Sequence, residues 1–174
     1  MPDALTLLRQ LFEYVAALPS SVAIRESENL YSYLLVSHVT GMALFAGLVL
    51  MMDLRLIGIG NMRTPFSELQ RRLFPVQMVG MVITAVTGLL LVYAEPMRFF
   101  GNFPFWIKVV LMLLASINAF AFHHTTFLST KTWDMDRVLP PGARLAGVVG
   151  LVLWAAVVVS GRLIAYNWFQ IMAP

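Results

Sequence analysis

The chain contains 174 residues, of which 59% are hydrophobic and 12% are charged. Soluble domains carry about 25% charged residues, so this composition excludes an ordinary water-soluble globule. The chain has no cysteine, which excludes disulfides, iron–sulfur clusters, thiolate zinc sites and covalently attached haem. The net charge of +3 comes without a basic run, so we expect no nucleic-acid partner.

Residues 1–29 form an amphipathic N-terminal segment in our interpretation. Over residues 5–18 the apolar side chains recur at helical spacing, while Arg9, Gln10 and Glu13 fall elsewhere on the helix. A signal peptide is not expected, because no basic start precedes a continuous apolar core. The pattern predicts a short helix at the membrane surface, which ends at Pro19 and is followed by a charged stretch up to residue 29.

Four later windows contain no Asp, Glu, Lys or Arg: residues 31–52, 76–94, 109–130 and 145–161. A helix that spans the hydrocarbon core needs roughly 20 apolar residues, and each window provides them once the last continues to residue 168. We therefore predict an all-α integral membrane four-helix bundle over residues 30–174. The predicted helices cover about residues 30–54, 75–94, 105–128 and 144–168.

Lys and Arg are distributed unevenly between the two sides of this predicted bundle. Cytoplasmic loops carry an excess of these residues, so the richer side indicates the cytoplasm. The first connector (residues 53–75) and the third connector (residues 129–144) together hold seven Lys and Arg residues, and the other side holds five. This bias predicts cytoplasmic first and third connectors, with both termini on the outer side.

Two further groups of side chains have a structural interpretation. Asp53 closes the first predicted helix, and we predict a structural ion pair between it and Arg55 or an arginine of the next connector. Met51 with Met52 and Met78 with Met81 supply thioethers, which suit Cu(I). Met is also ordinary filler in apolar helices, and these pairs lack the close repeats of a copper path.

His38 is the strongest candidate for a functional residue. It lies eight residues into the first predicted helix, roughly 12 Å from the outer boundary. An ionisable group at such depth is costly and marks a functional site by default. Neutral imidazole is the usual axial ligand of non-covalent haem, and Gly41 one turn later leaves room for a porphyrin edge. The alternative is a neutral histidine bonded to a neighbouring helix.

Three cations are predicted to gather above His38. Lys108 opens the third helix, Arg162 lies near the outer end of the fourth, and Arg25 precedes the first. The two propionates of haem b need such partners at the membrane surface. Lipid phosphates are the alternative partners of each cation.

The second axial position of such a haem has several candidates. Met112 lies at a similar depth on the third helix, and Asn118 is a weaker candidate. His123 lies 18 residues past Phe105, or roughly 27 Å from the outer side, which favours an interfacial position near the cytoplasmic headgroups.

Several runs of the sequence carry a family resemblance. The runs IRESENLYSYLLVSHVTGMALFAGLVLMMDLRLIG and NFPFWIKVVLMLLASINAFAFHH resemble a bacterial family of small, uncharacterised four-helix inner-membrane proteins. This resemblance implies a multi-pass protein of the bacterial inner membrane, and both termini are then expected in the periplasm.

A more distant resemblance is to the membrane protoporphyrinogen oxidase and the copper-resistance D proteins. It is carried by the first-helix His followed by FAGL and LRL, by RRL before TGLLL, and by Trp and Lys at the start of the third helix. The resemblance implies haem b at His38 and a role in activity for Lys108. The chain departs from the oxidase near Asn118, where the family has its second histidine, and in the fourth helix, which lacks the family's Arg, Asn, Glu and Pro pattern.

These observations lead us to expect a b-type cytochrome-like protein with haem b. It would transfer electrons between a membrane quinol and a partner protein of the membrane or periplasm. The rival expectation is a structural or anchor subunit of a larger membrane complex, which binds lipid and has no redox centre. Transport of copper or another solute needs a polar path, and the middle of the second and fourth helices offers only Thr84, Thr87 and Ser160.

Overall fold

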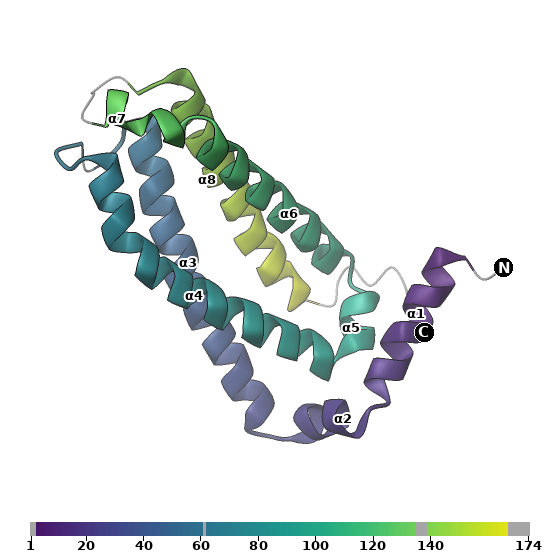
Figure 1. Ribbon diagram of the computed structural model, residues 1–174. Coiled ribbons are helices and arrows are strands. Elements are labelled where there is room, and N and C mark those ends of the chain that lie inside the picture. Colours follow the sequence, from purple (N-terminus) through teal and green to yellow (C-terminus); the bar gives the residue numbers. More distant parts are fainter. Residues whose placement is uncertain (1–2, 61, 135–138, 167–174) are drawn as a thin grey trace.

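The computed structural model describes residues 3–60, 62–134 and 139–166 (Figure 1). Within these ranges all regular secondary structure is helical. The long helices are α3 (Leu30–Ile57), α4 (Phe66–Ala94), α6 (Phe103–His124) and α8 (Pro141–Ile164). The short ones are α1 (Ala4–Ala16), α2 (Pro19–Glu26), α5 (Pro96–Phe100), the 3₁₀ turn η1 (Phe127–Ser129) and α7 (Thr130–Trp133).

The four long helices confirm the predicted all-α membrane bundle. Each is long and apolar enough to cross a bilayer, with α6 and η1 counted as one continuous stretch. Most of their large apolar side chains face outward, as lipid-facing side chains do. Examples on α4 and α6 are Val82, Leu89, Leu113, Ile117 and Phe120.

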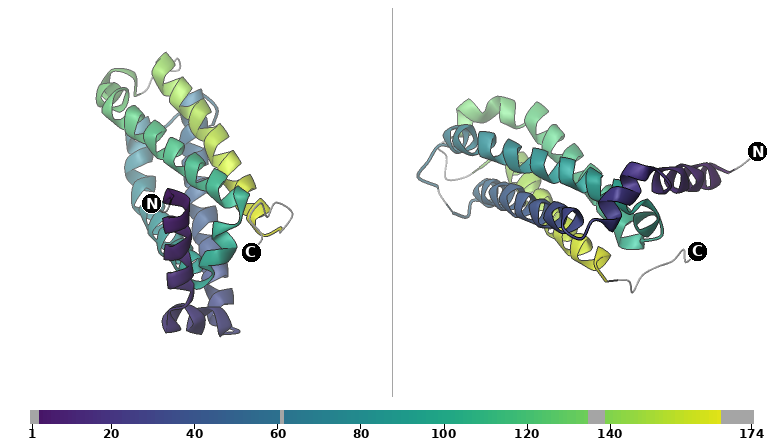
Figure 2. Two further views of the ribbon diagram at one scale, coloured as in Figure 1. Left: turned by 90° about the vertical axis from the view of Figure 1, so that its right-hand side faces the viewer. Right: turned by 90° about the horizontal axis from the view of Figure 1, so that it is seen from below.

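The four long helices pack in the order α4, α3, α8 and α6. α3 contacts both α4 and α8, and α8 in turn contacts α6 (Figure 1). We call the end at which α3 begins the His38 end, and the end at which α3 finishes the Asp53 end. α1, α2 and α5 lie at the His38 end, outside the four-helix bundle, and η1 and α7 lie at the Asp53 end (Figures 1 and 2).

α4 begins at Phe66, earlier than the predicted start near residue 75. Its first turn is stabilised from a distant segment, because the backbone N–H and the hydroxyl of Ser67 donate to the two carboxylate oxygens of Asp134, at 2.8 and 2.6 Å. Pro75 therefore lies inside the helix, where it lacks a backbone N–H to donate. A helix of 29 residues is about 43 Å long, so it extends past a hydrocarbon core of about 30 Å.

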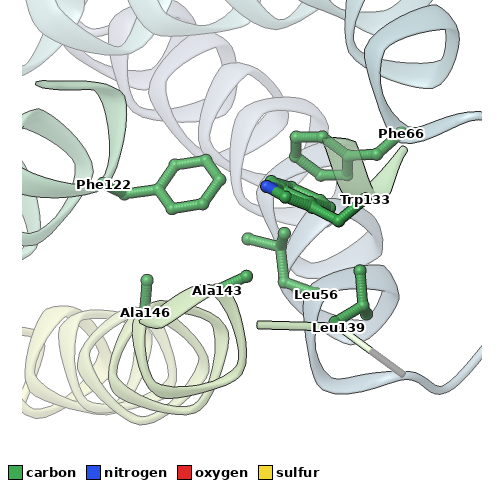
Figure 3. Packing of buried hydrophobic residues seen from close by; sticks show 7 residues of the cluster. All are labelled: Leu56, Phe66, Phe122, Trp133, Leu139, Ala143 and Ala146. Atoms are coloured by element: carbon green, nitrogen blue, oxygen red, sulfur yellow. The ribbon is translucent and has the colours of Figure 1, made fainter. Parts of the chain in front are cut away.

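The apolar core is concentrated at the Asp53 end. Figure 3 shows its seven buried side chains, which come from α3, α4, α6, α7, α8 and the segment just before α8: Leu56, Phe66, Phe122, Trp133, Leu139, Ala143 and Ala146. The ring of Phe66 lies 5.9 Å from that of Phe122 and 5.7 Å from that of Trp133, centre to centre. This cluster joins all four long helices at one end of the bundle.

The N-terminal segment packs on the opposite end. The Phe12 ring of α1 lies 5.3 Å from the ring of Phe100 in α5, centre to centre. The buried Ser21 of α2 donates to the backbone oxygen of Tyr93 at 2.8 Å. Pro19 is the first residue of α2, and this helix continues to Glu26, so the first part of the charged stretch expected before residue 29 is helical.

Candidate functional site

The His38 side chain of α3 is held by α4. Its Nδ1 lies 3.0 Å from the backbone oxygen of Thr84 and 3.2 Å from Oγ1 of Thr87. A backbone oxygen only accepts hydrogen bonds, so these partners assign the proton of the neutral ring to Nδ1. The Thr87 hydroxyl donates to the backbone oxygen of Ile83 at 2.5 Å, which leaves its lone pairs for Nδ1. Nε2 then carries a lone pair, and it has no hydrogen-bond partner among the described residues.

Glycines allow this close approach of α3 to α4. A Cβ atom on Gly88 would lie 2.9 Å from Cε1 of His38, and one on Gly41 would lie 2.8 Å from Cγ2 of Ile83. Gly41 was expected to leave room for a porphyrin edge, and this expectation is wrong. The side chains of Ile83 and Thr84 fill the space beside Gly41, which serves the helix–helix contact.

Lys108 reaches the same level of the bundle from α6. Its Nζ lies 3.4 Å from the position of a Cβ atom on Gly161, so the side chain runs along α8. Its charge is near enough to act on the imidazole of His38. Among the residues the structure describes, no acidic group pairs with Lys108. The four long helices thus build one polar layer, the His38–Lys108 site: His38, Thr84, Thr87, Gly88, Lys108 and Gly161.

The other two predicted cations lie at the surface of the His38 end. Arg162 is exposed, and its Nη2 donates to the hydroxyl of Tyr166 at 3.3 Å while its guanidinium carbon lies 5.3 Å from the centre of that ring. Arg25 is exposed in the last turn of α2. The structure therefore brings Lys108 to His38 and leaves Arg162 and Arg25 outside this layer.

The candidates for a second axial ligand all lie elsewhere on α6. Met112 is 41% exposed, and Nδ2 of Asn118 donates to the backbone oxygen of Ala146 on α8 at 3.0 Å. His123 lies at the Asp53 end, roughly 22 Å along α6 from Lys108. Within the described ranges, no group of three or more His, Cys, Asp or Glu side chains is placed to hold a metal ion.

His123 is exposed and has partners of its own. Its Nε2 lies 3.3 Å from Nε2 of Gln70, and its ring stacks on Phe127 at 4.6 Å between centres. This arrangement places His123 at the Asp53 end of the bundle, away from His38.

Sequence reasoning missed a second polar network at the His38 end. The Tyr31 hydroxyl donates to Oε2 of Glu95 at 2.7 Å, and Nη1 of Arg98 donates to the same oxygen at 2.6 Å. Burial by itself lowers the pKa of Arg98, but the hydrogen bond to Glu95 and its charge outweigh this, so the pKa lies above its ordinary value. The network ties the start of α3 to the junction of α4 and α5. The nearness of Glu95 and Arg98 in sequence was its only advance signal.

The prediction that Asp53 forms an ion pair is wrong for the residues that the structure describes. Residues two apart on a helix do not face each other, and Arg55 turns away from Asp53. Nη2 of Arg55 donates to the backbone oxygens of Thr64, at 3.3 Å, and of Asp134, at 3.4 Å. No other arginine among the described residues forms an ion pair with Asp53.

Comparison with known proteins identifies one family. No curated protein and no solved structure matches the chain. A family model described as a family of unknown function matches residues 28–167, which include all four long helices and the whole His38–Lys108 site. The chain therefore belongs to the family of unknown function DUF6644.

Proposed function

We propose that this protein is a b-type cytochrome-like membrane protein in which His38 is an axial ligand of haem b. The observation that carries the proposal is the state of the imidazole. Nδ1 is bonded to the Thr84 backbone oxygen, and Nε2 presents a lone pair without a partner among the described residues. A metal-bound histidine usually donates its other ring N–H in this way, which sets the tautomer and the ring orientation.

Lys108 supports the same ligand. A cation inside a membrane bundle is costly when no anion accompanies it, and Lys108 has no acidic partner in the described chain. Haem b offers both an iron for Nε2 and carboxylates for a lysine. One molecule thus satisfies both members of the site. In this proposal the exposed Arg162 and Arg25 are further partners for the propionates, at the surface of the same end.

The bound haem would supply one-electron redox chemistry, and the chain would supply its environment. His38, held by Thr84 and Thr87, would bind and orient the group, Lys108 would neutralise a carboxylate, and the apolar helices would exclude water. We propose electron transfer from a membrane quinol to a partner protein. The Lys and Arg bias and the family resemblance support a place in a bacterial inner membrane, with both termini and the His38 end facing the periplasm.

The test is the absorption spectrum of protein purified in detergent. We expect a Soret band and a reducible α band in the wild type and their loss in His38→Ala. His124→Ala is the matched control, because His124 is exposed at the Asp53 end and packs on the Phe120 ring at 4.1 Å. A wild type that carries no haem, even after addition of haemin, would overturn the proposal. Equal bands in wild type and His38→Ala would do the same.

A structural or anchor subunit of a larger membrane complex is the second candidate. The observation that favours it is again His38, because a neutral histidine that donates to the Thr84 backbone oxygen also serves as a clamp between α3 and α4. This candidate predicts a co-purified assembly that stays intact and active in His38→Ala if stability is preserved. Isolation of a stable monomer with bound haem would count against it.

A further inference from the structure

Asp53 occupies an unusual position in the contact between α3 and α8. It is 8% exposed, and its Oδ2 is fully buried without a hydrogen-bond partner. A Cβ atom on Gly150 would lie 2.6 Å from Oδ2 and 2.8 Å from Oδ1. A Cβ atom on Gly147, one turn away, would lie 2.8 Å from the Asp53 backbone oxygen. The carboxyl group therefore lies directly on the bare backbone of α8.

No cation compensates this carboxyl group within the described chain. On its own helix Arg55 donates to Thr64 and Asp134, and on α4 Glu68 and Arg72 pair with each other. The Asp134 carboxyl group accepts hydrogen bonds from Ser67. The other described titratable or charged side chains at this end are exposed and form no hydrogen bond or ion pair with Asp53: Arg63 in the first connector, Arg71 on α4, His123 and His124 on α6, and Arg144 on α8.

An ionised carboxylate is poorly suited to this environment. Burial of a charge without a partner is so unfavourable that such groups usually become neutral instead. A carboxylic acid becomes neutral by binding a proton at one oxygen. The neutral acid also offers an O–H donor toward the backbone of α8, which Gly147 and Gly150 leave uncovered.

We propose that Asp53 is a proton-binding site, whose carboxyl group carries a proton while α3 and α8 are in contact at the Asp53 end. Loss of the proton breaks the O–H bond, leaves a carboxylate and transfers the proton to the aqueous phase. The carboxylate then requires water, which weakens the contact with Gly147 and Gly150. Asp53 lies roughly 22 Å along α3 from His38, so this site does not depend on the haem proposal.

Infrared spectroscopy tests the protonation directly. In neutral buffer the wild type should show the carbonyl stretch of a protonated carboxylic acid, which shifts when aspartate is labelled with ¹³C. The band should vanish in Asp53→Asn. It should persist in Asp134→Asn, the matched control, because the oxygens of Asp134 accept hydrogen bonds from Ser67. A wild type without the band, or a band that survives in Asp53→Asn, would overturn the proposal.

The effect on the helix contact is measured by thermal unfolding in detergent at increasing pH. A carboxyl group that is neutral in the folded protein ionises more readily in the unfolded chain. Rising pH therefore favours the unfolded state and lowers the stability of the folded protein. The unfolding temperature of the wild type should therefore fall from mildly acidic to mildly alkaline buffer, and that of Asp53→Asn should fall less. If Asp53→Asn does not fold, the labelled wild type alone decides. As pH rises, the infrared band of its protonated acid must disappear. Over the same pH range, amide exchange in α3 and α8 near Asp53 must increase by more than the ordinary rise of exchange with pH. A constant band and constant exchange contradict the proposal.

Discussion

Gly88 of α4 lies directly against the imidazole of His38, so that a Cβ atom there would come within 2.9 Å of Cε1. The same helix supplies the Thr84 backbone oxygen that binds Nδ1. A hydrogen bond at Nδ1 thus holds the ring, and the lack of a side chain at Gly88 leaves the space that Cε1 occupies. This relationship makes the ring orientation sensitive to very small changes in α4.

Gly88→Ala should displace the His38 ring. The added methyl group overlaps the ring, and overpacking of this kind typically costs about 1–3 kcal/mol. Unfolding in detergent measures the loss, and, if the protein binds haem as proposed, a changed haem absorbance would report the displaced ring. Gly47→Ala is the matched control, because nothing lies within 4 Å of a Cβ atom at Gly47. Equal effects of the two substitutions would contradict the close contact.

Thr87→Val should weaken the hold on Nδ1 without changing the shape of the side chain. One hydrogen bond acceptor is lost while the Thr84 backbone oxygen remains, so we expect a cost of about 0.5–1.5 kcal/mol. Thr84→Val is the control, since its hydroxyl donates within α4 to the backbone oxygen of Gly80 at 2.7 Å. In protein with bound haem, only Thr87→Val should change the reduction potential. A larger change in Thr84→Val would argue against the role of Thr87.

Lys108→Met should have opposite effects on the two forms of the protein. Removal of an unpaired charge from the bundle should raise the unfolding temperature of ligand-free protein, because the methionine has no charge to desolvate. If Lys108 pairs with a haem propionate as proposed, the same substitution should lower the amount of haem retained, because that partner would be lost. Arg162→Gln, which alters an exposed side chain, should leave the ligand-free stability close to that of the wild type. A less stable ligand-free Lys108→Met would mean that Lys108 has a structural role.

Gly150→Ala should destabilise the contact of α3 with α8. Its methyl group meets the Asp53 carboxyl oxygens at 2.6 and 2.8 Å, and a cost of about 1–3 kcal/mol is typical of such overlap. Asp53→Ala in the same chain removes those oxygens, so the double variant should be more stable than the sum of the two single effects. Strict additivity in this double-mutant cycle would show that the two positions do not touch.

Tyr31→Phe should loosen the start of α3 from the junction of α4 and α5. The hydroxyl donates to Glu95, and its loss should cost about 1 kcal/mol because the network is partly exposed to solvent. Tyr33→Phe is the control, since Tyr33 is 69% exposed. Hydrogen exchange of the first turns of α3 measures the change. Equal protection in both variants would contradict a stabilising role for the network.

Composition alone predicts the four spanning helices. Hydrocarbon excludes unpaired backbone polar groups, so a charge-free apolar segment of sufficient length forms a helix whatever its neighbours are. For the same reason His38 stood out inside one of these segments, where an ionisable group is rare, and Lys108 stood out at the edge of another. The extra turns of α4 before Pro75 were not predictable, since they depend on Asp134, which is distant in the chain.

Which side chains meet depends on how the helices pack against one another. The rotation of each helix about its axis depends on how small residues of neighbouring helices fit together, and composition does not specify this fit. Gly88 therefore faces His38 while Gly41 faces Ile83, although either glycine is a reasonable neighbour by spacing. The ion pair expected for Asp53 is absent from the described residues for the same reason. The nearest arginine in sequence points to another side of α3, and two glycines of α8 allow the carboxyl group to rest on bare backbone.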